Sequence, residues 1–226
     1  MTGYRRYCIY VVPEGALYDR GACWLGWDSA AGRARTLPAL PGLTDSAEAL
    51  TARPRKYGFH GTIKPPFRLA DGHDAAGLRA ALDRFCAGRP PVTLPGLEVA
   101  PLGRFVALRA VGDEGALAAL AGETVRALDD FRAARDAAEL ARRQHAELTE
   151  RQAALLARWG YPYVMDEFRF HMTLTGPLEA PEADARVLAG HFADVLPSPF
   201  VIASLALLGE DAQGRFHLLH RAPLSG

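Results

Sequence analysis

The 226-residue chain has little of what marks several common protein classes. Its three cysteines, at positions 8, 23 and 86, form no Cys-x-x-Cys pair, which argues against a disulfide framework or a cysteine zinc site and fits a reducing cytoplasm. No apolar run approaches the roughly 18 residues of a membrane helix. Lys+Arg and Asp+Glu both number 26, so there is no net charge to attract long nucleic acid. We therefore expect a cytoplasmic protein with neither a membrane nor a long nucleic acid as partner.

Several catalytic motifs are also absent. The chain has no G-x-G-x-x-G, no phosphate-binding G-x-x-x-x-G-K-[ST] loop and no G-x-S-x-G, so nucleotide-fold and serine-hydrolase functions have no motif support. It has no H-E-x-x-H and no Cys/His cluster either, and we expect no metal and no cofactor.

What the chain does have is enough apolar sequence, 49%, to bury a sizeable core. Strand-like and helix-like segments are mixed and often joined by hairpin-length connections, which predicts an α+β fold with antiparallel sheets. We expect one bilobal domain over residues 1–226. Within it, residues 114–159 are rich in Ala, Leu, Arg and Glu and predict two long helices that break near residues 131–135. Their arginines (for example Arg142, Arg143 and Arg151) predict solvated faces, or alternatively a lid over a groove.

The strongest signal is an internal repeat. Residues 59–66 (FHGTIKPP) and 170–177 (FHMTLTGP) share the pattern Phe-His-x-Thr-aliphatic-x-x-Pro, 111 residues apart. We call them the first and second motif. They lie in segments around 57–68 and 168–178. A repeat at this distance predicts two halves of one fold related by a pseudo-twofold axis.

Strand periodicity sharpens this interpretation, because side chains alternate between the two faces of a strand. The residues predicted on the polar faces are His60, Thr62 and Lys64 in the first copy and Arg169, His171, Thr173 and Thr175 in the second. Two imidazoles can carry protons, two threonine hydroxyls can hold phosphate oxygens, and nearby cations can balance negative charge. We therefore expect His60, Thr62, His171 and Thr173 to be catalytic if the two faces line one groove.

Other residues near the first motif are candidate substrate contacts. Lys56 and Lys64 are the only lysines of the chain, and both flank His60. Lys64, Arg169 and Thr175 share a face with a histidine, whereas Lys56 belongs to an Arg-Pro-Arg-Lys run at 53–56 that predicts either a solvated turn or a site for a second phosphate. Tyr57 can stack on a base or sugar, or pack against the protein.

The paired motifs, within "RPRKYGFHGTIKPPFRL" and "WGYPYVMDEFRFHMTLTGPL", resemble the two-histidine (2H) phosphoesterase superfamily, which includes bacterial cyclic phosphodiesterases once called 2′-5′ RNA ligases. The similarity covers essentially the whole chain and is greatest to a branch found among phosphonate-utilisation genes. It implies a bilobal fold with two antiparallel sheets facing a central cleft, helices outside and no metal. It also implies that His60 with Thr62, and His171 with Thr173, form the two catalytic motifs.

The expected function is metal-independent hydrolysis of a cyclic phosphodiester of a small sugar or nucleotide. One histidine takes a proton from water while the other protonates the leaving alkoxide, and the sequence does not assign these roles. The phosphonate context suggests a substrate like 5-phosphoribosyl 1,2-cyclic phosphate. Alternatives are a 2′,3′-cyclic nucleotide or RNA end, a non-catalytic module that binds a phosphorylated metabolite, or a metal-dependent phosphoesterase with His60 and His171 as ligands.

Overall fold

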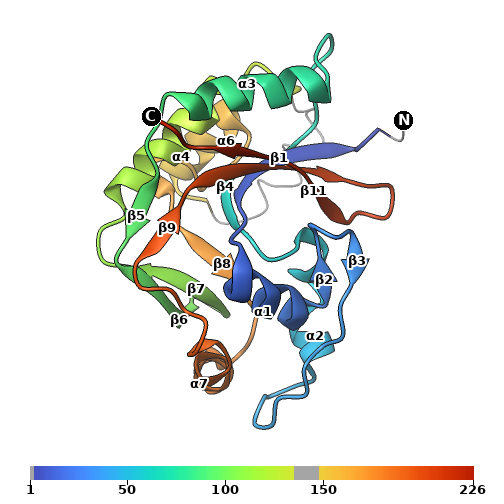
Figure 1. Cartoon of the computed structure of the whole chain (residues 1–226), viewed down its shortest axis with the longest axis vertical. Coiled ribbons are helices and arrows are strands. Elements are labelled where there is room, and N and C mark those ends of the chain that lie inside the picture. Colours follow the sequence, from blue (N-terminus) through green and yellow to red (C-terminus); the bar gives the residue numbers. More distant parts are fainter. Residues whose placement is uncertain (1–2, 135–147) are drawn as a thin grey trace.

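The protein is built around one seven-stranded antiparallel sheet (Figure 1), seen in a computed structural model that describes residues 3–134 and 148–226. The strands follow the order β11-β10-β1-β4-β8-β7-β6. Their bounds are β1 Arg6–Val11, β4 Gly61–Phe67, β6 Gly96–Leu102, β7 Phe105–Val111, β8 His171–Thr173, β10 Ser204–Glu210 and β11 Phe216–Pro223. Two short ribbons complete the strands, β2 (Trp27–Asp28) with β3 (Arg33–Ala34) and β5 (Val92–Leu94) with β9 (Phe200–Ile202).

The sheet consists of two halves, each of which contains one of the repeated motifs. Strands β11-β10-β1-β4 form one half and β8-β7-β6 the other, and the halves join through the single pair Gly61–Met172. The predicted α+β class with antiparallel strands is confirmed. The two expected sheets are continuous at their junction, which brings the two motif strands side by side.

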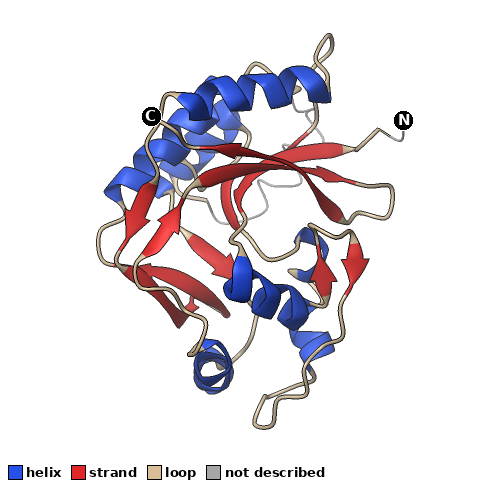
Figure 2. Cartoon of the chain, in the orientation of Figure 1, coloured by secondary structure: helices blue, strands red, loops and turns tan. Residues whose placement is uncertain are grey.

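The helices lie outside the sheet (Figure 2). Their bounds are α1 Gly15–Leu25, α2 Ala47–Thr51, α3 Ala75–Ala87, α4 Gly115–Ala127, α6 Glu150–Trp159 and α7 Pro181–Phe192, with 3₁₀ turns η1 Arg55–Tyr57 and η2 Met165–Glu167. Helix α3 packs against β10 and β11, and α7 packs against β6 and β7. The two halves of the sheet thus each have their own covering helix.

The predicted helical segment 114–159 is seen in part. Helix α4 ends at Ala127, before the expected break at residues 131–135, and α6 begins at Glu150. At the start of α6 the Thr149 hydroxyl accepts from the Gln152 amide while the Gln152 side chain accepts from the Thr149 amide, a capping box that stabilises the first turn. The rest of the segment, with Arg142 and Arg143, lies outside the described residues.

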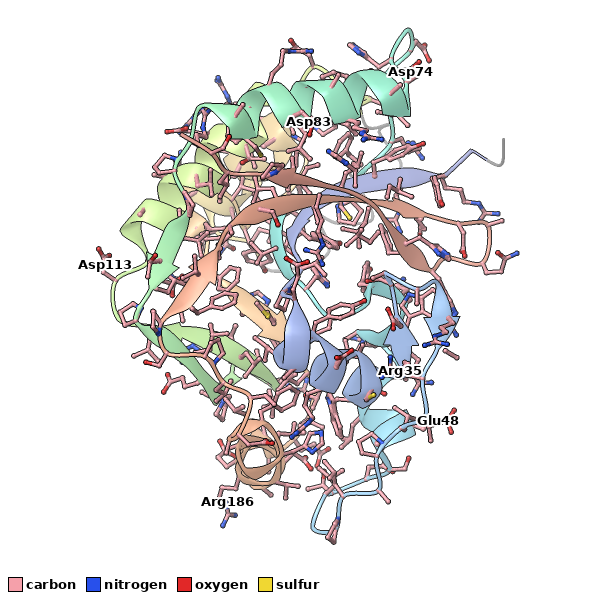
Figure 3. All side chains as sticks on the ribbon, viewed as in Figure 1. Arg35, Glu48, Asp74, Asp83, Asp113 and Arg186 are labelled. Atoms are coloured by element: carbon pink, nitrogen blue, oxygen red, sulfur yellow. The ribbon has the colours of Figure 1, made fainter. Side chains whose placement is uncertain are left out.

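Apolar side chains of both halves share one core. Trp24, Phe59 and Phe170 are almost completely buried in it, whereas charged side chains such as Asp113 and Arg186 project outward (Figure 3). In the described part of the chain, no helix combines the length and the apolar composition that crossing a membrane requires. The shared core thus joins the two halves of the sheet that carry the motifs.

Candidate active site

The two motifs meet on one face at the centre of the sheet. Gly61 of β4 pairs with Met172 of β8 in antiparallel register, and in each motif the histidine and the threonine flank that paired residue. On a strand, the two residues on either side of a given residue point to the same face. The four side chains therefore lie on the same side of the sheet. The antiparallel direction sets each histidine across from the threonine of the other motif.

All four motif side chains line a single pocket of about 370 Å³. Its walls also carry Arg6, Tyr10, Arg53, Tyr57, Phe105 and Tyr161. No Asp or Glu is among the described residues that line this pocket, so its formal charges are the two guanidinium groups and any proton on the histidines. A pocket of this size and sign suits a small anionic ligand.

Each imidazole is held by the backbone carbonyl of the residue two positions before it in the chain. Nδ1 of His60 lies 2.8 Å from the carbonyl oxygen of Gly58, and Nδ1 of His171 lies 2.9 Å from that of Arg169. A carbonyl only accepts, so Nδ1 carries the proton in both rings. Nε2 is therefore the nitrogen that can accept or donate a proton in the pocket.

Contacts around His60 set its position further. Its ring stacks on Tyr10 with centroids 3.7 Å apart. The Thr62 hydroxyl lies 3.2 Å from Nε2, and since Nδ1 holds the proton in the neutral ring, that hydroxyl is the donor. The ring of Phe105 lies beside His171 at 5.6 Å. Both rings are thus flanked by aromatic side chains.

Burial lowers the pKa of both histidines, by different amounts. The pKa of His60 falls to about 4, chiefly through burial, and the charge of His171 lowers it further. The pKa of His171 is also lowered by burial, but the negative charge of Glu114 opposes the change while Arg109 adds to it. His60 is therefore neutral at pH 7, and His171 has a nearby carboxylate that favours its proton.

Of the predicted substrate contacts, Thr175 and Tyr57 line the pocket. The Thr175 hydroxyl accepts from the Val106 amide at 3.0 Å and donates to the Gly176 carbonyl at 2.9 Å. Tyr57 stacks on Phe216 with centroids 5.1 Å apart. Thr175 thus ties the end of the second motif to β7, and Tyr57 presents a packed ring to the pocket.

The prediction that Lys64 contacts the substrate is wrong, because Lys64 is 2% exposed and lies away from the pocket. Its ammonium donates to the Val125 carbonyl and pairs with Asp129, each at 3.1 Å. The register explains this: Thr62 and Lys64 pair with successive residues of β1, so β4 contains a bulge. A bulge breaks the alternation of faces and turns Lys64 toward α4.

Lys56 and Arg169 also lie outside the pocket lining, contrary to the prediction. Lys56 is exposed on η1, with its ammonium 4.9 Å from the Tyr57 ring centroid. Arg169 precedes β8, which begins only at His171, so strand alternation does not extend to it. Its guanidinium instead donates to the carbonyls of Asp166 and Phe168.

The pocket also contains residues that the sequence interpretation missed. Arg6 and Tyr10 come from β1, which carries no motif, and Tyr161 follows α6. Arg53 was not named individually, but it belongs to the Arg-Pro-Arg-Lys run, for which the sequence predicts either a solvated turn or a site for a second phosphate. A strand that pairs with a motif strand is the general place to look for such residues.

A metal centre would need a cluster of ligands. Within residues 3–134 and 148–226, no group of three His, Cys, Asp or Glu side chains is arranged to hold a metal ion. The side chains available at the pocket are two imidazoles, threonine hydroxyls, phenols and guanidiniums. Such a set is suited to proton transfer and to binding of phosphate oxygens.

Two adjacent central strands each present a His-x-Thr pair to one pocket, as the resemblance to the two-histidine phosphoesterases implies. The chain belongs to the family described as "Protein of unknown function (DUF1045)", whose model matches residues 62–217.

Similar proteins include two curated relatives named "Ribose 1,5-bisphosphate phosphokinase PhnN". The one from Janthinobacterium sp. (strain Marseille) is 36% identical over 231 residues, covering 98% of this chain and 51% of the relative. The one from Laribacter hongkongensis (strain HLHK9) is 37% identical over 216 residues, covering 92% of this chain and 49% of the relative. The chain thus spans about half the length of the curated relatives it matches.

Similar solved structures include E. coli LigT in apo form, with a TM-score of 0.49, 14% identity and 98% of each chain covered. A structure described as a phosphoesterase has a TM-score of 0.47 and 15% identity, with 98% of this chain and 99% of the other covered.

Proposed function

We propose that the protein hydrolyses a cyclic phosphodiester of a small sugar phosphate, with the two histidines as base and acid and without a metal ion. The observation that carries this proposal is the matched pair of imidazoles in one pocket. Each ring has Nδ1 bonded to a backbone carbonyl two residues earlier, which leaves Nε2 for proton transfer. Two proton carriers in a pocket that lacks carboxylates among its described lining residues favour chemistry on an anionic ester.

The reaction moves two protons. Water attacks phosphorus as one neutral imidazole takes a proton at Nε2, so a new P–O bond forms. The P–O bond to the leaving oxygen breaks on the opposite side, and the other imidazole, which starts as an imidazolium, gives its Nε2 proton to that oxygen. The product is an open phosphomonoester, and the two rings return to their starting states by exchanging protons with solvent. When the substrate binds, the Thr62 hydroxyl turns from Nε2 of His60 to a non-bridging oxygen, and the Thr173 hydroxyl binds another. The negative charge of these oxygens also stabilises the imidazolium.

The surroundings of the two rings suggest how these roles divide. His60 is the more suitable base, because burial holds its pKa at about 4 and the ring is ready to accept a proton at pH 7. His171 is the more suitable acid, because the Glu114 carboxylate, which accepts from the Phe170 amide at 3.0 Å, favours its protonated form.

The substrate follows from chemistry together with the relatives. Those relatives are named for ribose 1,5-bisphosphate, whereas this chain has no G-x-x-x-x-G-K-[ST] phosphate loop. Opening a 1,2-cyclic phosphodiester of ribose 5-phosphate by breaking its P–O2 bond would leave ribose 1,5-bisphosphate. A substrate like 5-phosphoribosyl 1,2-cyclic phosphate is therefore our first choice.

A second candidate, a 2′,3′-cyclic nucleotide or RNA end, is favoured by the aromatic lining. Tyr57, Phe105 and Tyr161 all line the pocket, and a base can stack on such rings. Tyr57 packs on Phe216 and also lines the pocket, so its ring is held in place beside a ligand.

A substrate panel followed by phosphorus NMR tests the proposal. We expect turnover of a ribose cyclic phosphate and, at most, slower turnover of 2′,3′-cyclic nucleotides and cyclic RNA ends, with a phosphomonoester as product. The rate should survive exhaustive chelation, because proton transfer needs only the imidazoles. Loss of activity on chelation and recovery with added metal would identify the histidines as ligands instead. Tight binding of these compounds without any turnover would leave only a binding module.

The pH dependence tests the division of roles. We expect kcat/KM to fall as the pH drops through the pKa of about 4 of His60, and to fall again as the pH rises through the pKa of His171, which lies below its usual value. The resulting bell lies on the acid side of neutrality. Both limbs of the pH profile of kcat should lie at higher pH than those of kcat/KM, because the bound phosphate anion raises the pKa of each imidazole. A kcat/KM that rises steadily through neutral to alkaline pH would contradict these assignments.

A further inference from the structure

The two cations of the pocket differ in how far they are already engaged. Arg6 donates from Nε and Nη2 to the Glu210 carboxylate at 2.5 and 2.6 Å. Arg53 is exposed, and none of the described residues forms a hydrogen bond or ion pair with its guanidinium. An arginine without a protein partner in a pocket can give its full donor set to an anionic ligand.

A backbone contact of α2 with the second motif places Arg53, which follows this helix, beside the end of that motif. The Gly176 amide donates to the Leu50 carbonyl at 2.7 Å, which fastens α2 to that motif. Cβ and Cδ of Arg53 lie 3.9 Å from the position that a Cβ on Gly176 would take. The stem of Arg53 therefore lies beside the backbone of the motif, and the residue as a whole is exposed.

Arg53 also stands where the pocket continues into a second hollow. Arg53, Gly176 and Pro177 line both the histidine pocket and an adjoining hollow of about 1000 Å³. The second hollow is also lined by Arg104, Asp45 and Glu179, so the formal charge of its lining beyond Arg53 is negative. Arg53 is thus the charged residue at the place where the linings of the two hollows meet.

We propose that Arg53 binds a second, non-reacting phosphate of the substrate. The substrate class is then a small cyclic phosphodiester that also carries a terminal phosphomonoester. This inference rests on the proposed function, because it needs the ester phosphorus to lie between the two histidines. A phosphomonoester matches the planar donor fork of a guanidinium, which can bind two of its oxygens at once.

The experiment compares two substrates that differ in one group, ribose 1,2-cyclic phosphate with and without a phosphate on O5. We expect the wild type to favour the phosphorylated substrate in kcat/KM by about 10- to 100-fold, the range of a charge-assisted hydrogen-bonded pair. Arg53→Gln should lose this preference, because its loss of kcat/KM should be much larger on the phosphorylated substrate than on the unphosphorylated one. Arg53→Lys should restore part of the preference, since it keeps the charge without the fork.

A matched control and a binding measurement complete the test. Arg186→Gln removes an exposed arginine that projects from α7 away from the sheet (Figure 3), and it should leave both rates unchanged. Calorimetry with ribose 5-phosphate, which cannot react, should give a dissociation constant about 10- to 100-fold weaker for Arg53→Gln than for wild type.

The outcomes separate this inference from the proposed function. Equal wild-type rates on the two substrates, or an equal loss on both in Arg53→Gln, would overturn the role of Arg53 and leave the hydrolase intact. An Arg53→Gln variant that still prefers the phosphorylated substrate would also overturn the role of Arg53 and leave the hydrolase intact. No turnover of either substrate by the wild type would count against the hydrolase itself.

Discussion

Replacing either histidine with asparagine is expected to lower kcat by about 10²- to 10⁴-fold, the usual contribution of one proton-transfer group. Asparagine can still donate to the carbonyl of Gly58 or Arg169, so the local backbone keeps its partner. It cannot accept or deliver a proton as imidazole does. The measurement is kcat on the best cyclic substrate of the panel, together with the melting temperature of each variant.

The double variant should be little slower than the slower of the two single variants, because base and acid act in one step. His73→Asn is the control, since His73 is exposed and contacts Phe131 outside the pocket. It should turn over at the wild-type rate. If His60→Asn or His171→Asn kept a rate within about threefold of wild type while folded, that histidine would not be a proton carrier.

The two histidines and two threonines of the site could be predicted because they depend on two patterns that a single sequence contains. The repeat identified two equivalent strands, and alternation identified which side chains of each strand share a face. Phe59 and Phe170 each precede a histidine, which by alternation places them on the opposite face, and both are buried in the core. Neither pattern needs knowledge of how the strands pair in the sheet.

Other residues of the site were predicted wrongly or were missed, and in each case the structure gives the reason. Lys64 follows a bulge that depends on the pairing of β4 with β1, which no local pattern reveals. Arg169 lies before a strand of only three residues, so its apparent alternation with His171 had no structural basis. Arg6 and Tyr10 reach the pocket only because β1 is the neighbour of β4 in the sheet. Sheet order is a tertiary property, and single-sequence patterns do not contain it.

Gly61→Ala is expected to lower activity strongly and also to destabilise the fold. A Cβ on Gly61 would lie 2.3 Å from the Phe170 ring, well inside van der Waals contact. Gly61 forms the only pair between β4 and β8, so the clash acts directly on the distance between the motifs. Overpacking of this kind costs about 1–3 kcal/mol of the free energy of unfolding. A shift of about 1 Å between catalytic groups can cost about 10²-fold in rate.

Urea denaturation and kcat measurements on the same samples test this expectation. Gly190→Ala is the matched control, because Gly190 is exposed on α7 with nothing within 4 Å of its Cβ position. That variant should be about 0.5–1 kcal/mol more stable than wild type and equally active. Adding Phe170→Leu to Gly61→Ala should recover part of the lost stability and rate, since the shorter side chain removes the clash. The two substitutions would then show a favourable coupling energy. A fully active and stable Gly61→Ala variant would mean that the two motifs do not depend on this close approach of β4 and β8.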